Sequence, residues 1–484
     1  MPANLPIQTH GDNYEPMELD LDVAEPGDQL GNELPVLDEV QLDLESYISH
    51  YSGLPRIYRL EFIADHCKSL RVEALTMALQ YIKDNTCNVK DYVRLFKKLQ
   101  EARTLQGPVP TTSNNNASTQ PYYNPHNQNH RFELYPDTTW IDTKTKQAAF
   151  KVEKLEGELK NFIYKANFVE GNLRRTQDDL GDHYLDCGDL ENAYSAYTKS
   201  RSYATSNKNQ VNQCLNIIRV SILLKRWSAV SNHVLRAESQ PTNTSPCSSD
   251  SQIHPAVSTK LHCAAGLHEL NSKRYKKAAK HFISTNFDHF DCKYGVLAPV
   301  NIAVYGSLCA LASYSRQELA NQIINSASFK QFSELDPQLR EALTRFHESK
   351  YAACLTILQE IKNSLLLDMY LAPHVERLYR LIKNKALIQY FEPYSSACMR
   401  RMAQAFGMSL DELEREIINL ICDGHITAKI DSHQKILFAR NADSRAQTFK
   451  RAITMGKQWQ RQTQTLITRS ALIKSGLEVN TSST

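Results

Sequence analysis

The sequence predicts a mostly α-helical protein, built as a solenoid of helix pairs followed by a winged helix and a long C-terminal helix. Apolar residues recur at helical spacing over most of the 484 residues, and a short turn followed by a small residue recurs five times. Near the C-terminus the spacing changes to the alternation that is typical of strands. A chain of this length exceeds one small core, so several packed units are expected.

The first 135 residues divide into three predicted parts. Residues 1–39 are acidic and contain five prolines, and no Lys or Arg occurs in the first 50 residues. Such a composition cannot bury enough surface to offset its ordering entropy, so we expect this segment to be disordered. Helical spacing over residues 40–105 predicts a small helical domain. Residues 106–130 are uncharged and rich in Asn, Thr, Ser, Gln and Pro, which predicts a low-complexity linker over residues 106–135.

Residues 136–376 are predicted to form the solenoid. The recurring turn is clearest in the sequence GDLENAYSAY, which begins at residue 188. The equivalent positions are spaced by about 34 to 48 residues, which is typical of tetratricopeptide-like helix pairs, because a small residue lets two antiparallel helices approach. These positions are Ala193, Val230, Ala278, Ala320 and Cys354.

Residues 377–440 are predicted to form the winged helix. Helical spacing stops at Gly407 and resumes after Ser409, which opens a capping box. Two alternating runs then predict a two-stranded wing, whose outer strand can pair with a strand of another chain. A proline at Leu437 is expected to weaken subunit pairing by removing a ladder donor. The residues expected to anchor the wing on the core are Ile426, Ala428, Ile430, Ile436 and Phe438.

Residues 441–474 are predicted to form an amphipathic helix, followed by a short tail at 475–484. The helix has seven Lys and Arg against one Asp, and its apolar stripe has a spacing near 3.5. We expect the stripe to pack against other subunits. The alternatives are that it packs on the chain's own winged helix, or that the basic face binds a polyanion such as an inositol phosphate. The predicted protein interface comprises Phe449, Ile453, Trp459, Leu466 and Ile467 of this helix, with Ile426, Ile430, Ile436, Leu437 and Phe438 of the wing.

No pattern in the sequence predicts a catalytic, cofactor or metal site. The glycines are never spaced as in phosphate-binding loops, and no His-Glu pair is followed by a second His at zinc-binding spacing. The eleven cysteines include no CxxC pair, which is typical of buried free thiols in a reducing compartment. No secretory signal pattern is present, and polar residues dilute the apolar stretch from Tyr294 to Ser315, which favours a buried solenoid helix over a membrane span. We therefore expect a protein that is not an enzyme and holds no cofactor.

Nucleic-acid binding is an alternative, because a winged helix often places its second-to-last helix in the major groove. In this sequence the corresponding helix, 409–423, has five Asp and Glu against Arg415 alone. Contacts with phosphate need the opposite sign of charge, so the sequence argues against nucleic acid.

The order of a helical-repeat array and a winged helix resembles the PCI module. Four segments carry a more specific likeness, and they are YSGLPRIYRLEFIADHCKSLRVEAL (51–75), DDLGDHYLDCGDLENAYSAY (178–197), LLLDMYLAPHVERLY (365–379) and IDSHQKILFAR (430–440). These segments resemble the subunit-one family of the COP signalosome, the complex that removes the ubiquitin-like modifier Nedd8 from cullins. The likeness extends over about residues 42–474, and the related PCI subunits of the proteasome regulatory lid share the layout. Residues 106–130 do not resemble the family, so no role is carried over to them.

The resemblance implies a non-catalytic scaffold. In this family PCI subunits join through their wings, their C-terminal helices gather into a bundle, and the isopeptidase is a different, metal-binding subunit. The implied partners are other PCI subunits and, indirectly, the metalloprotease subunit and neddylated cullin–RING ligases. No membrane partner is implied, and the expected localisation is cytoplasmic and nuclear. The alternatives that stay open are a scaffold of the proteasome lid and a winged-helix nucleic-acid binder.

Overall fold

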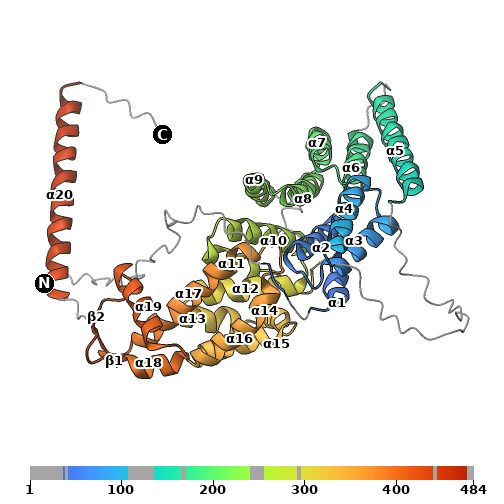
Figure 1. The fold of residues 1–484 in the computed structure, drawn as a ribbon. Coiled ribbons are helices and arrows are strands. Elements are labelled where there is room, and N and C mark those ends of the chain that lie inside the picture. The colour runs from blue at the N-terminus through green and yellow to red at the C-terminus, as the bar shows by residue number, and fades with distance from the viewer. Residues whose placement is uncertain are drawn as a thin grey trace, which may run out of the picture. The chain divides into compact units, whose positions relative to one another are not determined.

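The computed structural model describes residues 36–38, 42–106, 136–164, 170–239, 255–290, 296–439 and 444–476. It contains two compact units, residues 1–385 and residues 386–484. The helices and strands of both units are labelled in Figure 1. The predicted disordered segment at 1–39, the linker at 106–135 and the tail at 475–484 fall almost wholly outside the described residues.

The first unit begins with four helices around one apolar core. Just after the second helix, Cys67 forms an isolated bridge with Leu37. Apolar residues at helical spacing, such as Leu60, Leu75 and Leu95, are fully or almost fully buried in this core. The helices are α1 (Leu44–Ser49), α2 (Leu54–His66), α3 (Arg71–Asn85) and α4 (Val89–Gln106).

The rest of the first unit is a succession of helices, most of them packed in antiparallel pairs (Figure 1). The pairs α6/α7, α8/α9, α10/α11 and α15/α16 carry the repeat. The elements are α5 (Thr138–Tyr164), α6 (Glu170–Asp186), α7 (Leu190–Ser200), η2 (Arg201–Tyr203), α8 (Asn207–Leu223), α9 (Trp227–Glu238), α10 (Pro255–Asn271), α11 (Tyr275–Ile283), α12 (Pro299–Ser313), α13 (Arg316–Leu319), the π-helical η4 (Ala320–Ile324), α14 (Ala327–Ser333), α15 (Pro337–His347), α16 (Tyr351–Leu365) and α17 (Ala372–Phe391), which continues into the second unit.

Four of these pairs share one turn geometry, which identifies them as copies of one repeat. In each turn a residue with positive φ stands five positions before the small residue that sequence analysis singled out. The N–H of the following residue donates to the carbonyl five residues back, as from Arg226 to Ser221 at 2.8 Å. The positive-φ residues are Gly188, Lys225, Lys273 and Ser349, with φ of 74°, 57°, 61° and 63°.

The two helices of a pair approach closely because one lacks a side chain where the other carries a ring. A Cβ added at Gly181 would lie 2.6 Å from the ring of Tyr197, and one at Gly266 would lie 2.6 Å from the ring of Phe282. In these two pairs the absent side chain of the glycine makes room for the large ring of the facing residue, so the helices pack without a void. In the other two pairs the equivalent positions hold buried aliphatic residues in place of a glycine and a ring, Ile218 with Val234 and Ala342 with Leu358.

The fifth predicted turn, at residue 315, has a different geometry. Ser315 forms a capping box with Glu318 at the start of α13, which runs into η4. Ala320 is only half-buried, and α14 rather than this segment packs against α12. The prediction of an equivalent turn here was wrong. The matched sequence forms the short helix α13 and continues into η4, and it does not form the second helix of an antiparallel pair with α12.

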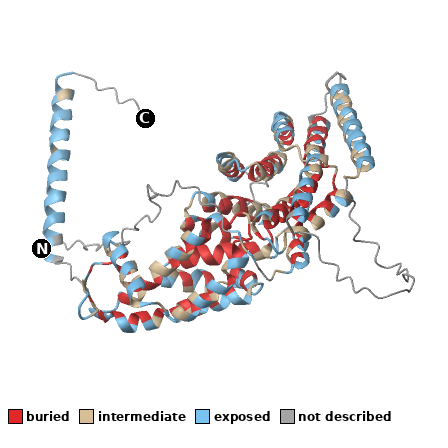
Figure 2. Ribbon diagram, viewed as in Figure 1, coloured by how far each residue is buried: buried red, intermediate tan, exposed pale blue. Residues whose placement is uncertain are grey.

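Helix α12 is buried along almost its whole length, as predicted for an apolar solenoid helix (Figure 2). In the part of the chain that the structure describes, no helix combines the length and the hydropathy that crossing a membrane requires.

The second unit is a winged helix, as predicted. After the end of α17 it consists of β1 (Ser396–Cys398), α18 (Met399–Phe406), α19 (Leu410–Cys422), β2 (Ala428–Asp431) and β3 (Ile436–Ala439). Gly407 ends α18 in the left-handed conformation, with φ of 64°, and the Ser409 hydroxyl accepts a hydrogen bond from Glu412 N at 3.3 Å to cap α19. The strands form an antiparallel sheet of order β1-β3-β2, so the wing has one strand more than predicted. Beyond it lies α20 (Ser444–Lys474).

Candidate interaction surfaces

A buried polar cluster joins α2 to α12 and to the turn between α16 and α17. Arg59 Nη1 donates to Asp368 Oδ2 at 2.9 Å and to the Tyr47 hydroxyl at 2.9 Å. The two charged side chains are only 1% and 9% exposed. The guanidinium also lies over the ring of Tyr51, 4.3 Å from its centroid. The positive charge is therefore enclosed by one carboxylate and two tyrosines.

Asp368 receives hydrogen bonds from four further groups. Asn301 Nδ2 donates at 2.7 Å and the Tyr305 hydroxyl at 2.5 Å, and the backbone N–H groups of Tyr370 and Leu371 donate at 3.0 and 3.3 Å. Burial, reinforced by the Asp368 charge, raises the pKa of Tyr305 well above its usual range, so the hydroxyl stays a donor. The cluster unites the two segments 51–75 and 365–379, and it fixes the N-terminal helices on the solenoid.

The central strand β3 determines which side chains of the wing face the core. Leu437 is fully buried, and it pairs with Ala397 on one side and Ile430 on the other. Because side chains alternate along a strand, Ile436 and Phe438 lie on the opposite face, and Phe438 is 43% exposed. The prediction that Ile436 and Phe438 anchor the wing was therefore wrong, because the residue of β3 that faces the core is Leu437, between them.

The other predicted anchors occupy the expected side of the sheet. Ile426 and Ala428 are buried, and Ile430 is partly buried. The predicted effect of proline at Leu437, a weakening of subunit pairing greater than any unfolding of the repeats, assumed that Leu437 lies on the outer strand. That assumption is wrong, because Leu437 lies in the middle strand of the sheet and in the core.

The sheet has two edge strands, β1 and β2, and the outer side of β2 is the edge that belongs to the predicted wing. Met399 N donates to Lys435 O, and Ala439 N donates to Ser395 O, so odd-numbered residues of β3 bond to β1. By the alternation of an antiparallel ladder, Ile436 and Phe438 then bond to β2. The backbone groups of Ala428 and Ile430 point away from β3, where a strand of another chain can pair with them.

The turn between β2 and β3 is tied to α19. Lys435 Nζ lies 2.7 Å from Glu414 Oε2, and Ser432 Oγ donates to Glu414 Oε1 at 2.8 Å. The hydrogen bonds from Lys435 and Ser432 lower the pKa of Glu414. These contacts hold the hairpin against the helix, so the edge of β2 is presented on a fixed frame. On the same helix, Asp411 and Glu412 are exposed, where their charges would repel phosphate.

Helix α20 carries an apolar stripe that no described part of the chain covers (Figure 2). Trp459 is 70% exposed, and each of the other four predicted interface residues of this helix is at least 44% exposed. The alternative that the stripe packs on the chain's own winged helix stays a prediction. Exposed apolar surface on this scale is typical of an interaction site. The four residues are Phe449, Ile453, Leu466 and Ile467.

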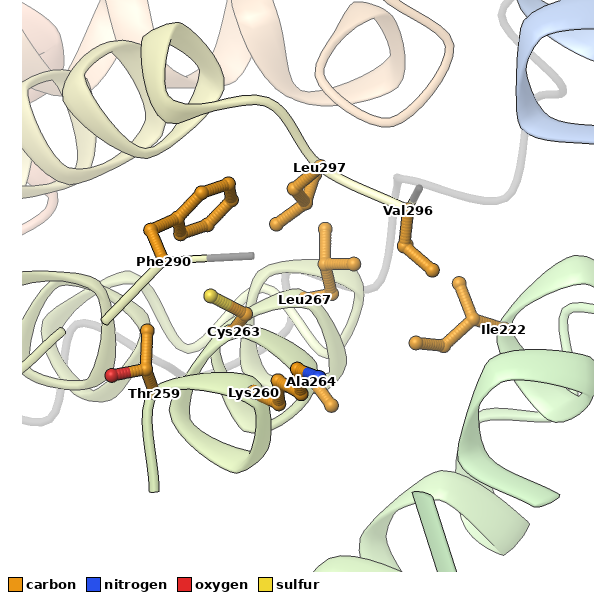
Figure 3. A pocket seen from close by; sticks show the side chains of 9 residues that line it. All are labelled: Ile222, Thr259, Lys260, Cys263, Ala264, Leu267, Phe290, Val296 and Leu297. Atoms are coloured by element: carbon orange, nitrogen blue, oxygen red, sulfur yellow. The ribbon is translucent and has the colours of Figure 1, made fainter. Parts of the chain in front are cut away.

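The cavity in Figure 3 is too small for a ligand. Its volume is about 20 Å³, which leaves room for about one water molecule, and its lining is mostly apolar. Burial raises the pKa of the lining thiol, Cys263, to about 12, so the thiol stays protonated and unreactive.

A larger cleft of about 370 Å³ lies between α2, α4 and the α16–α17 turn, lined by Tyr58, Glu61, Arg94 and Met369 among others. Its buried carboxylate, Glu61, is paired with Arg94 at 2.9 Å and with Lys98 at 2.8 Å. Within the described ranges, no three His, Cys, Asp or Glu residues are grouped as metal ligands.

Three family models match successive parts of the chain. Residues 137–322 match 26S proteasome subunit RPN7, residues 358–441 match the PCI domain, and residues 445–471 match the C-terminal helix of COP9 signalosome complex subunit 1. The chain is 46% identical to COP9 signalosome complex subunit 1b of Drosophila melanogaster, over 96% of this chain and 92% of the relative. The chain belongs to the COP9 signalosome subunit 1 family.

Further members of the subunit 1 family are similar over nearly the whole chain. The protein of Arabidopsis thaliana is 36% identical over 93% of both chains, and that of Emericella nidulans is 31% identical over 91% of this chain and 83% of its own. The 26S proteasome non-ATPase regulatory subunit 6 of Dictyostelium discoideum is 21% identical over 67% of this chain and 83% of its own. The matched signalosome helix corresponds to α20, so the family's own signature falls on the exposed stripe.

Proposed function

We propose that this subunit 1 family member is a non-catalytic scaffold of the COP9 signalosome. The observation that carries the proposal is α20, whose sequence matches the signalosome C-terminal helix and whose apolar stripe is exposed. A stripe with a spacing near 3.5 fits a bundle of helices contributed by several subunits.

The wing supplies a second contact of a different kind. The outer backbone of β2 can extend its sheet with a strand of a neighbouring PCI subunit, and the hydrogen bonds of such pairing are independent of side chains. Strand pairing would set the order of neighbours, while the helix bundle would contribute most of the buried apolar area.

In this role the chain contributes to catalysis only by position. The isopeptidase that removes Nedd8 from cullins would be another, metal-binding subunit, and the scaffold would hold that enzyme and a neddylated cullin–RING ligase in one assembly. Regulation of these ubiquitin ligases would follow, in both cytoplasm and nucleus. No cofactor is needed by the chain itself.

The two alternative functions are a scaffold of the proteasome lid and a nucleic-acid binder. A scaffold of the proteasome lid is supported by the match of residues 137–322, but the match at α20 favours the signalosome. A nucleic-acid binder is disfavoured by the acidic α19.

The test is affinity purification of the tagged full chain, followed by quantitative mass spectrometry and a deneddylation assay. Replacing Trp459 and Leu466 by Ala should remove most of the co-purifying PCI subunits and cullins, because truncating buried interface anchors costs about 2 kcal/mol or more each. The melting temperature of the isolated chain should not change, since both side chains are exposed in it.

The matched control replaces Lys457 and Arg461, which lie on the other face of the same helix, by Ala. Recovery of proteasomal ATPases in place of cullins would favour the lid, and recovery of chromatin alone would favour nucleic acid. Deneddylation by the isolated chain would contradict the scaffold function.

A further inference from the structure

The middle of the solenoid has a strong positive charge that the net charge of the whole chain conceals. Between residues 190 and 283 there are 13 Lys and Arg against four Asp and Glu, whereas the whole chain has 56 against 53. This excess is distributed over α7 to α11, within the first unit.

Several of the cations gather where one helix pair passes to the next. Lys199 and Arg236 lie in the last turns of α7 and α9, and Lys280 lies in the last turn of α11. Because the second helices of successive pairs run in the same direction, these turns lie at one edge of the solenoid. We define the basic edge as six residues, Lys199, Arg201, Lys208, Arg236, Lys277 and Lys280.

None of these six residues forms an ion pair with another described residue, in contrast to Arg226 and Arg274, which pair with Glu191 and Glu269. Cations at helix C-termini can be explained by the helix dipole alone. That explanation fails for Lys208, which lies in the first turn of α8, where the dipole disfavours a positive charge. Burial lowers the pKa of His233, and the positive charges of Arg236 and Arg201 lower it further. The electric field of these two cations therefore acts on a partly buried group of the solenoid.

We propose that the basic edge binds the acidic N-terminal segment of the same chain, residues 1–35. This segment contains eight Asp and Glu and no Lys or Arg, so its charge is complementary to that of the edge. It is attached to the first unit at Leu37, whose N–H donates to His66 O at 2.8 Å. Thirty-five residues extend to at most about 120 Å, so the segment is long enough to reach any face of this unit.

The consequence is an internal competition for one surface. A tethered segment has a high effective concentration, so it would exclude weakly binding polyanions and acidic proteins from the edge. A partner with a denser negative charge would displace the segment. The competition would take place within the isolated chain, independently of the proposed scaffold function.

The experiment is zero-length cross-linking of the purified full chain with a carbodiimide, which joins carboxylates to lysines in contact. Mass spectrometry then counts the links from residues 1–35 to each lysine. Links to Lys199, Lys208, Lys277 and Lys280 should exceed those to Lys97 and Lys330, exposed lysines outside the edge, several-fold at about 50 mM salt. The excess should disappear at about 500 mM salt, where charges are screened within a few Å.

Two variants make the test specific. Replacing Lys277 and Lys280 by Gln should reduce the links to Lys199 and Lys208 several-fold, while the same change at Lys97 and Lys330 should have no such effect. Neutralising Asp20, Asp22, Glu25 and Asp28 as Asn or Gln should act like the first variant. Circular dichroism confirms that each variant is folded.

Three results would overturn the proposal. The first is that links follow lysine exposure alone, without preference for the edge. The second is that, in a mixture of ¹⁴N- and ¹⁵N-labelled chains, links join different chains instead of the same chain. The third is that nucleic acid co-purifies on the edge while residues 1–35 form no links, which would identify a nucleic-acid surface.

Discussion

Arg59 and Asp368 stand 309 positions apart in the sequence and form a buried ion pair at 2.9 Å. The pair closes the first unit, because it connects the second helix of the chain to the last turn of the solenoid. A buried pair of this kind is stable only when both charges are fully hydrogen-bonded or stacked. Here the carboxylate accepts from five groups, and the guanidinium lies between tyrosine rings.

Replacing Asp368 by Ala should lower the free energy of unfolding of the first unit by about 3–5 kcal/mol, because the Arg59 charge would stay buried without its counter-ion. Urea denaturation measures this, with Trp227 as the probe, since its ring contacts Tyr370 beside the cluster. The double variant Arg59→Met with Asp368→Asn should lose less than Asp368→Ala alone. An equal or greater loss in the double variant would contradict a dominant role of charge.

Proline at Ile430 should weaken association with neighbouring PCI subunits while the winged helix stays folded. The N–H that it removes points away from β3, and proline is tolerated on the free side of an edge strand. Co-purification measures association, and circular dichroism measures folding. Ile430→Ala, which shortens the side chain but keeps the N–H, is the control and should retain most of the binding. Leu437→Pro should unfold the sheet, since that residue is central and buried.

Glycine at Lys225 should stabilise the chain by about 1 kcal/mol. Lys225 has φ of 57°, a left-handed conformation that a side chain disfavours and that Gly188 adopts freely in the equivalent turn. The midpoint of chemical denaturation should rise. Lys97→Gly, inside helix α4, is the matched control and should destabilise by about 1 kcal/mol. Equal effects of both changes would mean that the turn is not strained.

Acidification should destabilise the first unit between about pH 6.5 and pH 4. Burial, together with the charges of Lys273 and Arg377, lowers the pKa of His374 to about 4. Below pH 6.5 the unfolded chain binds a proton at this site that the folded chain does not, so unfolding becomes more favourable as pH falls. The group can account for up to about 3 kcal/mol.

His374→Gln should therefore flatten part of the pH dependence, as measured by denaturation at several pH values. His347→Gln, a change on helix α15, serves as the control and should leave the slope nearly unchanged. A slope that His374→Gln does not alter would assign the effect to other groups.

Local patterns in the sequence were sufficient for much of this architecture. The small residues Ala193 and Ala278 indicated the helix pairs, because close approach of two helices restricts residue size at a fixed spacing. The capping box at Ser409 located α19. The C-terminal helix was also predicted, since a helix of 31 residues repeats its pattern many times.

Other features have no local pattern. Three consecutive apolar residues, Ile436 to Phe438, fit either register of a strand, so the inward residue could not be chosen from sequence. The strand β1 reads Ser-Ala-Cys and has no β-branched or aromatic residue. The contact of Arg59 with Asp368 depends on how the whole first unit closes. The charge of α7 to α11 was hidden by averaging over the chain.

The exposed stripe of α20 also bears on how the cell controls the amount of this protein. Trp459, Leu466 and their neighbours present to solvent the kind of surface by which chaperones and proteases recognise unfolded proteins. A chain made in excess of its neighbours would therefore be treated as damaged, although it is correctly folded. Its lifetime would be set by the supply of the helices that cover it, and synthesis of the subunits would be matched without any dedicated sensor.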